Sequence, residues 1–180
     1  MRKLFSRRND LEELIETVRD SWDKLSKGIA KKKVQVLNEK TLELELAYIL
    51  RDNNLQVGRQ YVVRLSSGTN KTPSGIPEID LFATLKNGEE SYSAAIELKY
   101  PHNGTSTEYR QQIIDDIKNL EAYIQNDIVD VGFCLAYTTD KNYMDDTRSK
   151  VKIGSAGYPP EWISFNNDQD CFLTIIVDNQ

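Results

Sequence analysis

Two carboxylates and a lysine stand where a predicted β-hairpin would bring them together. Asp80 lies in an apolar stretch that leads into Asn87-Gly88, the strongest short signal for a hairpin turn. Glu97 and Lys99 occupy alternate positions of the strand that follows, so their side chains share one face of it. Converging carboxylates provide the oxygen ligands that a hard cation prefers, and the lysine adds a fixed positive charge. These residues would support metal-assisted hydrolysis of a phosphodiester.

The spacing of these residues resembles a known signature. Asp80, sixteen intervening residues and then Glu97-Leu98-Lys99 is similar to the signature of the PD-(D/E)XK nuclease superfamily, whose domains have the restriction-endonuclease-like fold. The resemblance implies that Asp80 and Glu97 hold Mg²⁺, with Mn²⁺ as a substitute, together with the backbone carbonyl of Leu98. It also implies that Lys99 orients or deprotonates the attacking water and stabilises the charge that develops at phosphorus. Ile79 stands where the motif names a proline.

Two features compete with this interpretation. Glu97 and Lys99 could form a plain ion pair on one face of the sheet, although a central and otherwise apolar strand makes such a pair costly to bury. A second string of the same type, Asp116-Ile117-Lys118, lies in a helical pattern, where positions two apart diverge around the axis. We therefore exclude the second string as the signature.

The resemblance further implies an acid from a helix close to the metal. Glu39 is the first choice, because it extends the apolar stripe of a helix that begins at Asn38. Glu43, one turn later, is the second choice, and an ordinary solvated helix acid is the alternative for both. Phosphate contacts, with a plain surface role as the alternative, are assigned to four further residues: Lys71, Arg110, Gln111 and Gln112.

The elements that must position these residues follow from periodicity and turn signals. Apolar residues at helical spacing predict helices from Asn9 to residue 29, from Asn38 to residue 52, and from a capping box at Thr105 and Glu108. Strands are predicted at 56–65, 79–85, 92–100, 131–137 and 172–177, with loop at 140–167. The continuous apolar run at 131–137 is typical of a strand buried on both faces, so the helix before it makes a right-handed crossover between parallel strands.

These elements predict a single α/β domain over residues 1–180. The expected fold class is a restriction-endonuclease-like mixed β-sheet with an αβββαβ core at 37–137, flanked by helices. Residues 1–36 form a basic amphipathic arm, an accessory helix whose apolar stripe covers the core or forms a dimer surface. Residues 138–180 form a C-terminal loop and strand.

Charge is distributed unevenly along the chain. Residues 1–36 carry a net charge of +4 and residues 37–180 a net charge of −9, which gives −5 for the whole chain. An acidic body opposes nucleic-acid binding, because phosphate neutralisation normally supplies much of the affinity. We expect the basic arm, with Arg7, Arg8 and Lys31 to Lys33, to bind the phosphates instead. A solvated helix end is the alternative for the three lysines.

Composition excludes several other classes of protein. Cys134 and Cys171 fall in apolar strands and are expected to be reduced core thiols, and with His102 as the only histidine a zinc site is excluded. No apolar run reaches the ~18 residues of a membrane span, and the first residues lack the apolar core of a signal peptide. We therefore expect a cytoplasmic protein with no membrane partner.

The sequence thus predicts a Mg²⁺-dependent endonuclease of restriction, defence or repair type. Its expected partner is nucleic acid, with DNA ahead of RNA, and a homodimer would supply the two sites that cutting two strands needs. The alternative is a module of the same fold that binds DNA or a partner protein without cutting.

Overall fold

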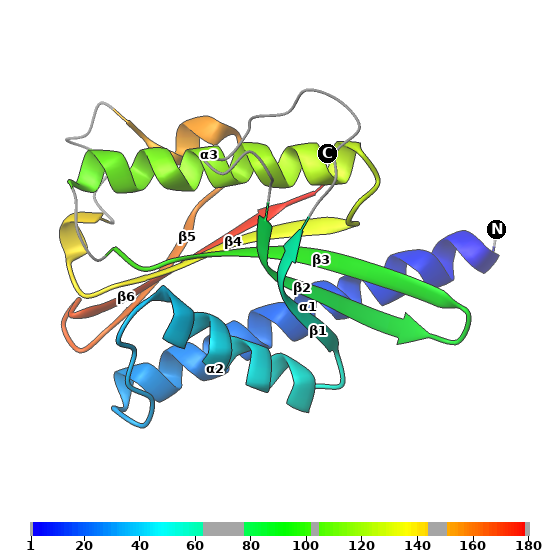
Figure 1. Ribbon diagram of the computed structural model, residues 1–180, viewed down its shortest axis with the longest axis horizontal. Helices are drawn as coiled ribbons and strands as arrows, with labels where there is room; N and C mark the ends of the chain where they lie inside the picture. The colour runs from blue at the N-terminus through cyan, green and yellow to red at the C-terminus, as the bar shows by residue number, and fades with distance from the viewer. Residues whose placement is uncertain (1, 63–77, 102–104, 144–150, 179–180) are drawn as a thin grey trace.

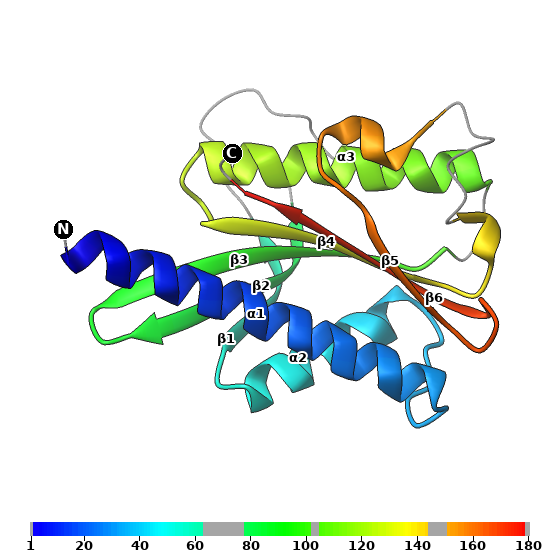
Figure 2. The same cartoon turned by 180° about the vertical axis from the view of Figure 1, so that it is seen from behind.

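The computed structural model describes residues 2–62, 78–101, 105–143 and 151–178 (Figure 1). It is an α/β fold in which one open, mixed, six-stranded sheet has helices on both faces. Helix α3 (Ser106–Gln125) covers one face, and α1 (Arg2–Ala30) and α2 (Glu39–Asp52) cover the other (Figure 2). Two short 3-10 turns, η1 (Lys141–Tyr143) and η2 (Ile153–Ala156), lie against α3.

The sheet has the strand order β1-β2-β3-β4-β6-β5. β3 and β4 run parallel and are joined by α3, whereas all other neighbours are antiparallel. The strands are β1 Gln56–Val62, β2 Glu78–Asn87, β3 Glu90–Lys99, β4 Val131–Thr138, β5 Glu161–Phe165 and β6 Asp170–Val177. The predicted order of helix, three strands, helix and strand is confirmed from α2 to β4.

The predicted hairpin joins β2 to β3. Asn87 pairs with Glu90, and Gly88 in the turn has a φ of 64°, a conformation that residues with a Cβ adopt only at a cost. The register pairs Leu81 with Ile96, so the preceding residue of β2, Asp80, comes opposite the residue after Ile96. The hairpin therefore sets the two predicted acids on neighbouring strands.

Each face of the sheet carries its own apolar cluster. The stripe of the first helix is buried in the cluster beneath α1 and α2, so it covers the core, one of its two predicted roles. Ile96 and Leu98 of β3 face this cluster, whereas Ala95 faces the cluster beneath α3. The predicted stripe of the third helix is buried as well and consists of Tyr109, Ile113, Ile117, Leu120 and Ile124.

Two predicted boundaries are wrong. Helix α1 begins at Arg2, so Asn9 lies inside it and does not cap it. The segment that contains β5 was predicted as loop. The residues of β5 alternate little in burial, so no strand pattern is visible in the sequence, and pairing with β6 holds them at the edge of the sheet. The expected strand at 56–65 is described as far as Val62.

The structure also bears on two expectations from composition, the state of the cysteines and the lack of a membrane-spanning helix. Cys134 and Cys171 are buried free thiols, as predicted. In the part of the chain that the structure describes, no helix combines the length and the apolarity needed to cross a membrane.

Candidate active site

Asp80 and Glu97 meet between β2 and β3. The Asp80 carboxylate accepts a hydrogen bond from the Leu98 backbone N–H at 2.9 Å, and a second hydrogen bond joins it to the carboxyl group of Glu97. Glu97 is only 5% exposed. The structure thus brings the two predicted acids together, with the main chain of Leu98 turned towards Asp80.

The environment of Glu97 disfavours its charge. Burial is the main reason that the pKa of Glu97 lies well above the usual 4.5, and the negative charges of Asp116 and Asp80 raise it further. Lys99 acts in the opposite direction but is outweighed. A protonated Glu97 donates the hydrogen bond that Asp80 accepts, and this proton relieves the repulsion between the two acids.

Lys99 is held by an acid that the sequence analysis set aside. Its ammonium group lies 2.9 Å from Oδ2 of Asp116 on α3, and the two side chains are 17% and 13% exposed. Burial opposes the charge on Lys99, yet the pKa of Lys99 is raised above its usual value, because Asp116, Glu39 and Glu97 together outweigh the burial. Burial likewise raises the pKa of Asp116 to about 6, although Lys99 lowers it.

Asp116 is therefore a site residue that sequence reasoning missed. A signal for it was present, because Asp116 lies three residues after Ile113 and four before Leu120 and so falls within the buried stripe of α3. Asp116 and Lys118 do diverge around the helix, as expected, and Lys118 is exposed. Asp116-Ile117-Lys118 is therefore not the strand signature, but Asp116 contacts Lys99 of the site from α3.

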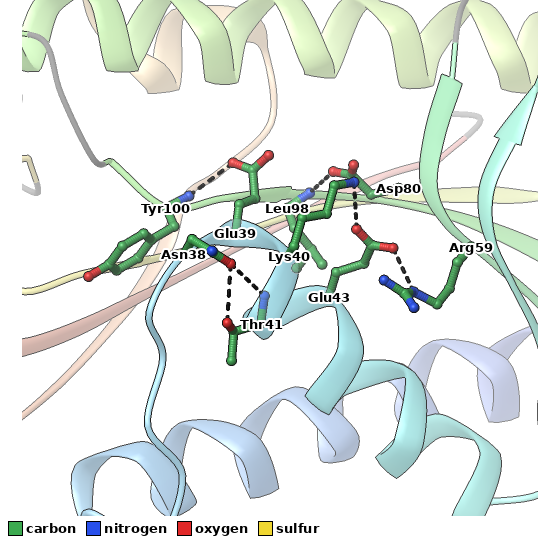
Figure 3. A network of polar contacts seen from close by, with 9 residues as sticks. All are labelled: Asn38, Glu39, Lys40, Thr41, Glu43, Arg59, Asp80, Leu98 and Tyr100. Atoms are coloured by element: carbon green, nitrogen blue, oxygen red, sulfur yellow. Dashed lines mark hydrogen bonds and ion pairs between the residues drawn. The ribbon is translucent and has the colours of Figure 1, made fainter.

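The first choice for the helix acid lies at the site. Asn38 caps α2 by accepting a hydrogen bond from the Thr41 N–H at 2.9 Å, and Glu39 follows as the first helical residue. Glu39 accepts a hydrogen bond from the Tyr100 N–H at 3.3 Å (Figure 3). Burial above all raises the pKa of Glu39, while Lys99 lowers it and Asp80 raises it. Glu39 thus lies within the electrostatic reach of the predicted lysine and first acid.

The second choice, Glu43, has a different environment. Its side chain is 1% exposed and lies 2.8 Å from the ammonium group of Lys40 and 2.8 Å from the guanidinium group of Arg59 (Figure 3). These two ion pairs occupy both of its carboxylate oxygens. Glu43 therefore ties α2 to β1, and the structure favours Glu39 as the helix acid.

The backbone of two neighbouring strands is irregular beside Asp80. Leu81 belongs to the cluster beneath α1 and α2, but Ile79, two residues earlier, belongs to the cluster beneath α3. In a regular strand these two residues would share a face, so the alternation breaks between them. On the neighbouring strand Gln60, the residue opposite, has a φ of 51°. Counted from Leu81, Asp80 keeps the regular alternation and lies on the same face as Glu97, so the residue that departs from the alternation is Ile79.

The residues predicted to contact phosphate differ in their exposure to solvent. Arg110 is 2% exposed, and its guanidinium group donates to the Asn142 carbonyl at 2.8 Å, so it holds η1 against α3. Gln111 and Gln112 are exposed on α3. Lys71 and His102 lie outside the described residues, and of the basic arm the structure describes the exposed side chains of Lys31 to Lys33.

The donors present can be compared with the needs of Mg²⁺. Within the described ranges, no group of three acidic, histidine or cysteine side chains is arranged to hold a metal ion. Mg²⁺, however, is commonly bound through one or two carboxylates, with water and substrate oxygens completing its shell. The N–H of Leu98 points to Asp80, and the carbonyl of the same residue points to the same side of its strand. Two carboxylates and a carbonyl oxygen are a donor set that fits a hard cation.

Comparison with known proteins assigns no family to the chain. No family model matches it, and neither a curated protein nor a solved structure matches it.

Proposed function

We propose that the protein is a Mg²⁺-dependent nuclease that hydrolyses phosphodiester bonds in nucleic acid, with DNA as the first candidate. The observation that carries the proposal is the meeting of Asp80, Glu97 and Lys99 at the junction of β2 and β3. The order of elements around them supports a domain of the PD-(D/E)XK, restriction-endonuclease-like type. A largely buried lysine close to three acids, Asp116, Glu39 and Glu97, is expensive to maintain without a use.

Each residue has a distinct role in this proposal. Asp80, Glu97 and the Leu98 carbonyl would hold the cation, and Glu39 would bind it or its water. When bound, Mg²⁺ supplies a Lewis acid for a phosphoryl oxygen and makes water more acidic. Because its raised pKa keeps Lys99 protonated, Lys99 would orient the attacking water and stabilise the negative charge that develops at phosphorus, and it would not take a proton from the water.

The proton on Glu97 links metal binding to pH. Carboxylates bind cations in their ionised form, so Glu97 must release its proton before it can serve as a ligand. Because burial and two neighbouring acids raise the pKa of Glu97, the affinity for Mg²⁺ should increase as the pH rises through that pKa. The increase should therefore fall at higher pH than for an exposed pair of carboxylates.

A panel of substrates tests the proposed activity. The purified protein is incubated with plasmid, single-stranded DNA, a branched junction and RNA, each with Mg²⁺, Mn²⁺ or EDTA. The proposal requires cleavage of at least one substrate with metal and none with EDTA. Cleavage that persists in EDTA, or no cleavage of any substrate with either metal, would contradict it.

A non-cleaving module of the same fold is the second candidate. The observation that favours it is the ion pair of Lys99 with Asp116, which holds the ammonium group against α3. Thermal unfolding across Mg²⁺ concentrations separates the two candidates, because a ligand that binds the folded state raises the melting temperature. In a nuclease, Glu97→Gln should abolish the rise seen with the parent protein. A parent protein that Mg²⁺ does not stabilise, or an unchanged response in the variant, would favour the non-cleaving module.

A further inference from the structure

An exposed tyrosine stacks on a partly buried phenylalanine at the β1 edge of the sheet. Tyr61 of β1 is 46% exposed, and its ring stacks on that of Phe82 of β2, with 4.6 Å between the ring centroids and 24° between their planes. Among the described residues β1 is an edge strand, so within them no further strand pairs with it on that side (Figure 1). Phe82 fixes the Tyr61 ring and leaves much of its surface open to solvent.

The backbone irregularity at Gln60 places Tyr61 on its face of the sheet. Arg59 reaches Glu43 of α2, on the side of the sheet that α1 and α2 cover (Figure 3). Regular alternation would put Tyr61 on that side as well. Tyr61 instead stacks on Phe82, which packs against the cluster beneath α3. A positive φ at a non-glycine residue is uncommon and costs stability. The positive φ of Gln60 reverses the alternation and so turns Tyr61 to the side of the sheet that α3 covers.

The pair lies beside the first acid of the site. Tyr61 pairs with Ile79, the residue before Asp80, and Phe82 follows Asp80 by two residues on the same strand. One step along a strand and one across to its neighbour separate the Cα atoms of Tyr61 and Asp80, which is about 6 Å. Lys40, half exposed on α2, lies close enough to interact with Asp80 and adds a cation on the other side. An aromatic ring and a cation therefore flank the acid.

We propose that Tyr61 is a stacking platform for an unpaired nucleobase next to the scissile phosphate, so that the substrate is a single-stranded segment of nucleic acid. The inference rests on the proposed nuclease function. Every base has a π-face, and bases of single strands stack on exposed aromatic side chains, whereas a base inside a duplex is already covered on both faces. A phosphodiester held at Asp80 would place its neighbouring base beside Tyr61, and Lys40 would lie near its phosphates.

Binding measured without cleavage tests this proposal. Fluorescence anisotropy in EDTA follows the binding of a labelled oligonucleotide as single-stranded DNA, as single-stranded RNA and as a DNA duplex. Tyr61→Ala should weaken binding of the single strands about 5- to 100-fold and change duplex binding by less than about twofold, as expected for one lost stacking contact. Tyr61→Phe, which keeps the ring, should bind like the parent. Tyr48→Ala is the matched control, because Tyr48 is 56% exposed but lies on α2.

Two further measurements guard against loss of structure in the variant. Tyr61→Leu keeps an apolar contact with Phe82 but has no π-face, so it should fold and still bind single strands weakly. A bromouracil-substituted oligonucleotide should photo-crosslink to the peptide that contains Tyr61. Equal single-strand binding by parent and Tyr61→Leu, equal losses for duplex and single strand, or a crosslink elsewhere would overturn the platform.

The outcomes also separate this proposal from the proposed activity. Tyr61-dependent binding of single strands by a protein that cuts nothing would keep the platform and reject the nuclease. Metal-dependent cutting that Tyr61→Leu leaves unchanged would reject the platform and keep the nuclease. Comparison of the DNA and RNA arms decides which nucleic acid the platform receives.

Discussion

Replacing Asp116 by asparagine should change the pH dependence of stability in a direction that the structure fixes. The carboxylate lies 2.9 Å from the ammonium group of Lys99 and is 13% exposed. Its pKa moves from 3.8 to about 6 in the folded protein, with burial as the main cause and Lys99 acting against it. An acid whose folded pKa is raised contributes stability that is fully present below its unfolded pKa and is lost as the pH rises through the folded pKa.

The size of the effect follows from these two values. At 1.36 kcal/mol per pH unit, the full loss is about 3 kcal/mol. Between pH 4 and pH 7 it is about 2 kcal/mol, because at pH 4 the unfolded carboxyl group is already about half ionised. Asparagine carries no charge to bury, and its side-chain carbonyl can still accept a hydrogen bond from Lys99. Asp116→Asn should therefore exceed the parent's free energy of unfolding by less than about 1 kcal/mol at pH 4 and by about 3 kcal/mol at pH 7.

Urea unfolding at both pH values measures this difference. Asp115→Asn is the matched control, since Asp115 neighbours Asp116 on α3 but its side chain is 58% exposed. The control should differ from the parent by the same small amount at both pH values. A variant at Asp116 that is less stable than the parent at pH 7, or equally displaced at both pH values, would refute the account of strained acids around Lys99.

The other predictions concern roles and packing. Asp80→Ala should lose Mn²⁺ binding in a calorimetric titration, whereas Lys99→Ala should keep most of it, because only the aspartate is a ligand; equal losses would show that the roles are wrongly assigned. Glu39→Gln should lower the rate of cleavage with little change in melting temperature. Glu43→Gln should lower the free energy of unfolding by about 2 kcal/mol, because it breaks two ion pairs of a buried carboxylate. The reverse pattern would make Glu43 the site acid. Gly132→Ala should cost about 2 kcal/mol in urea unfolding, since its Cβ would lie 2.8 Å from the Cβ of Leu120; an unchanged midpoint would show that α3 can shift away.

Much of the site could be predicted because it depends on short-range rules. Alternation along β3 puts Glu97 and Lys99 on one face, and the Asn87-Gly88 turn sets the register that brings Asp80 opposite Glu97. The capping preference of Asn38 places Glu39 at the start of α2. In each case the information lies within a few residues of the side chain that it positions.

What could not be predicted depends on contacts between distant segments. The pairing of Lys99 with Asp116 requires the packing of α3 on β3, although a carboxylate within the buried stripe of α3 was a usable signal. The left-handed backbone at Gln60 has no signature, because glutamine does not favour positive φ. Strand β5 is formed by its pairing with β6 and not by its own pattern of apolar residues.

The rates of cleavage by two lysine variants show whether Lys99 belongs to the active site. The chain contains two acid-X-lysine strings, and only Lys99 lies with Asp80 and Glu97, whereas Lys118 is exposed on α3. Single-turnover cleavage of the best substrate in Mg²⁺ is measured for the parent, Lys99→Ala and Lys118→Ala. Lys99→Ala should lose about 10²-fold or more, the usual size of a lost charge-stabilising group, and Lys118→Ala should stay within about twofold of the parent. Equal rates for the two variants would contradict the assignment of the active site.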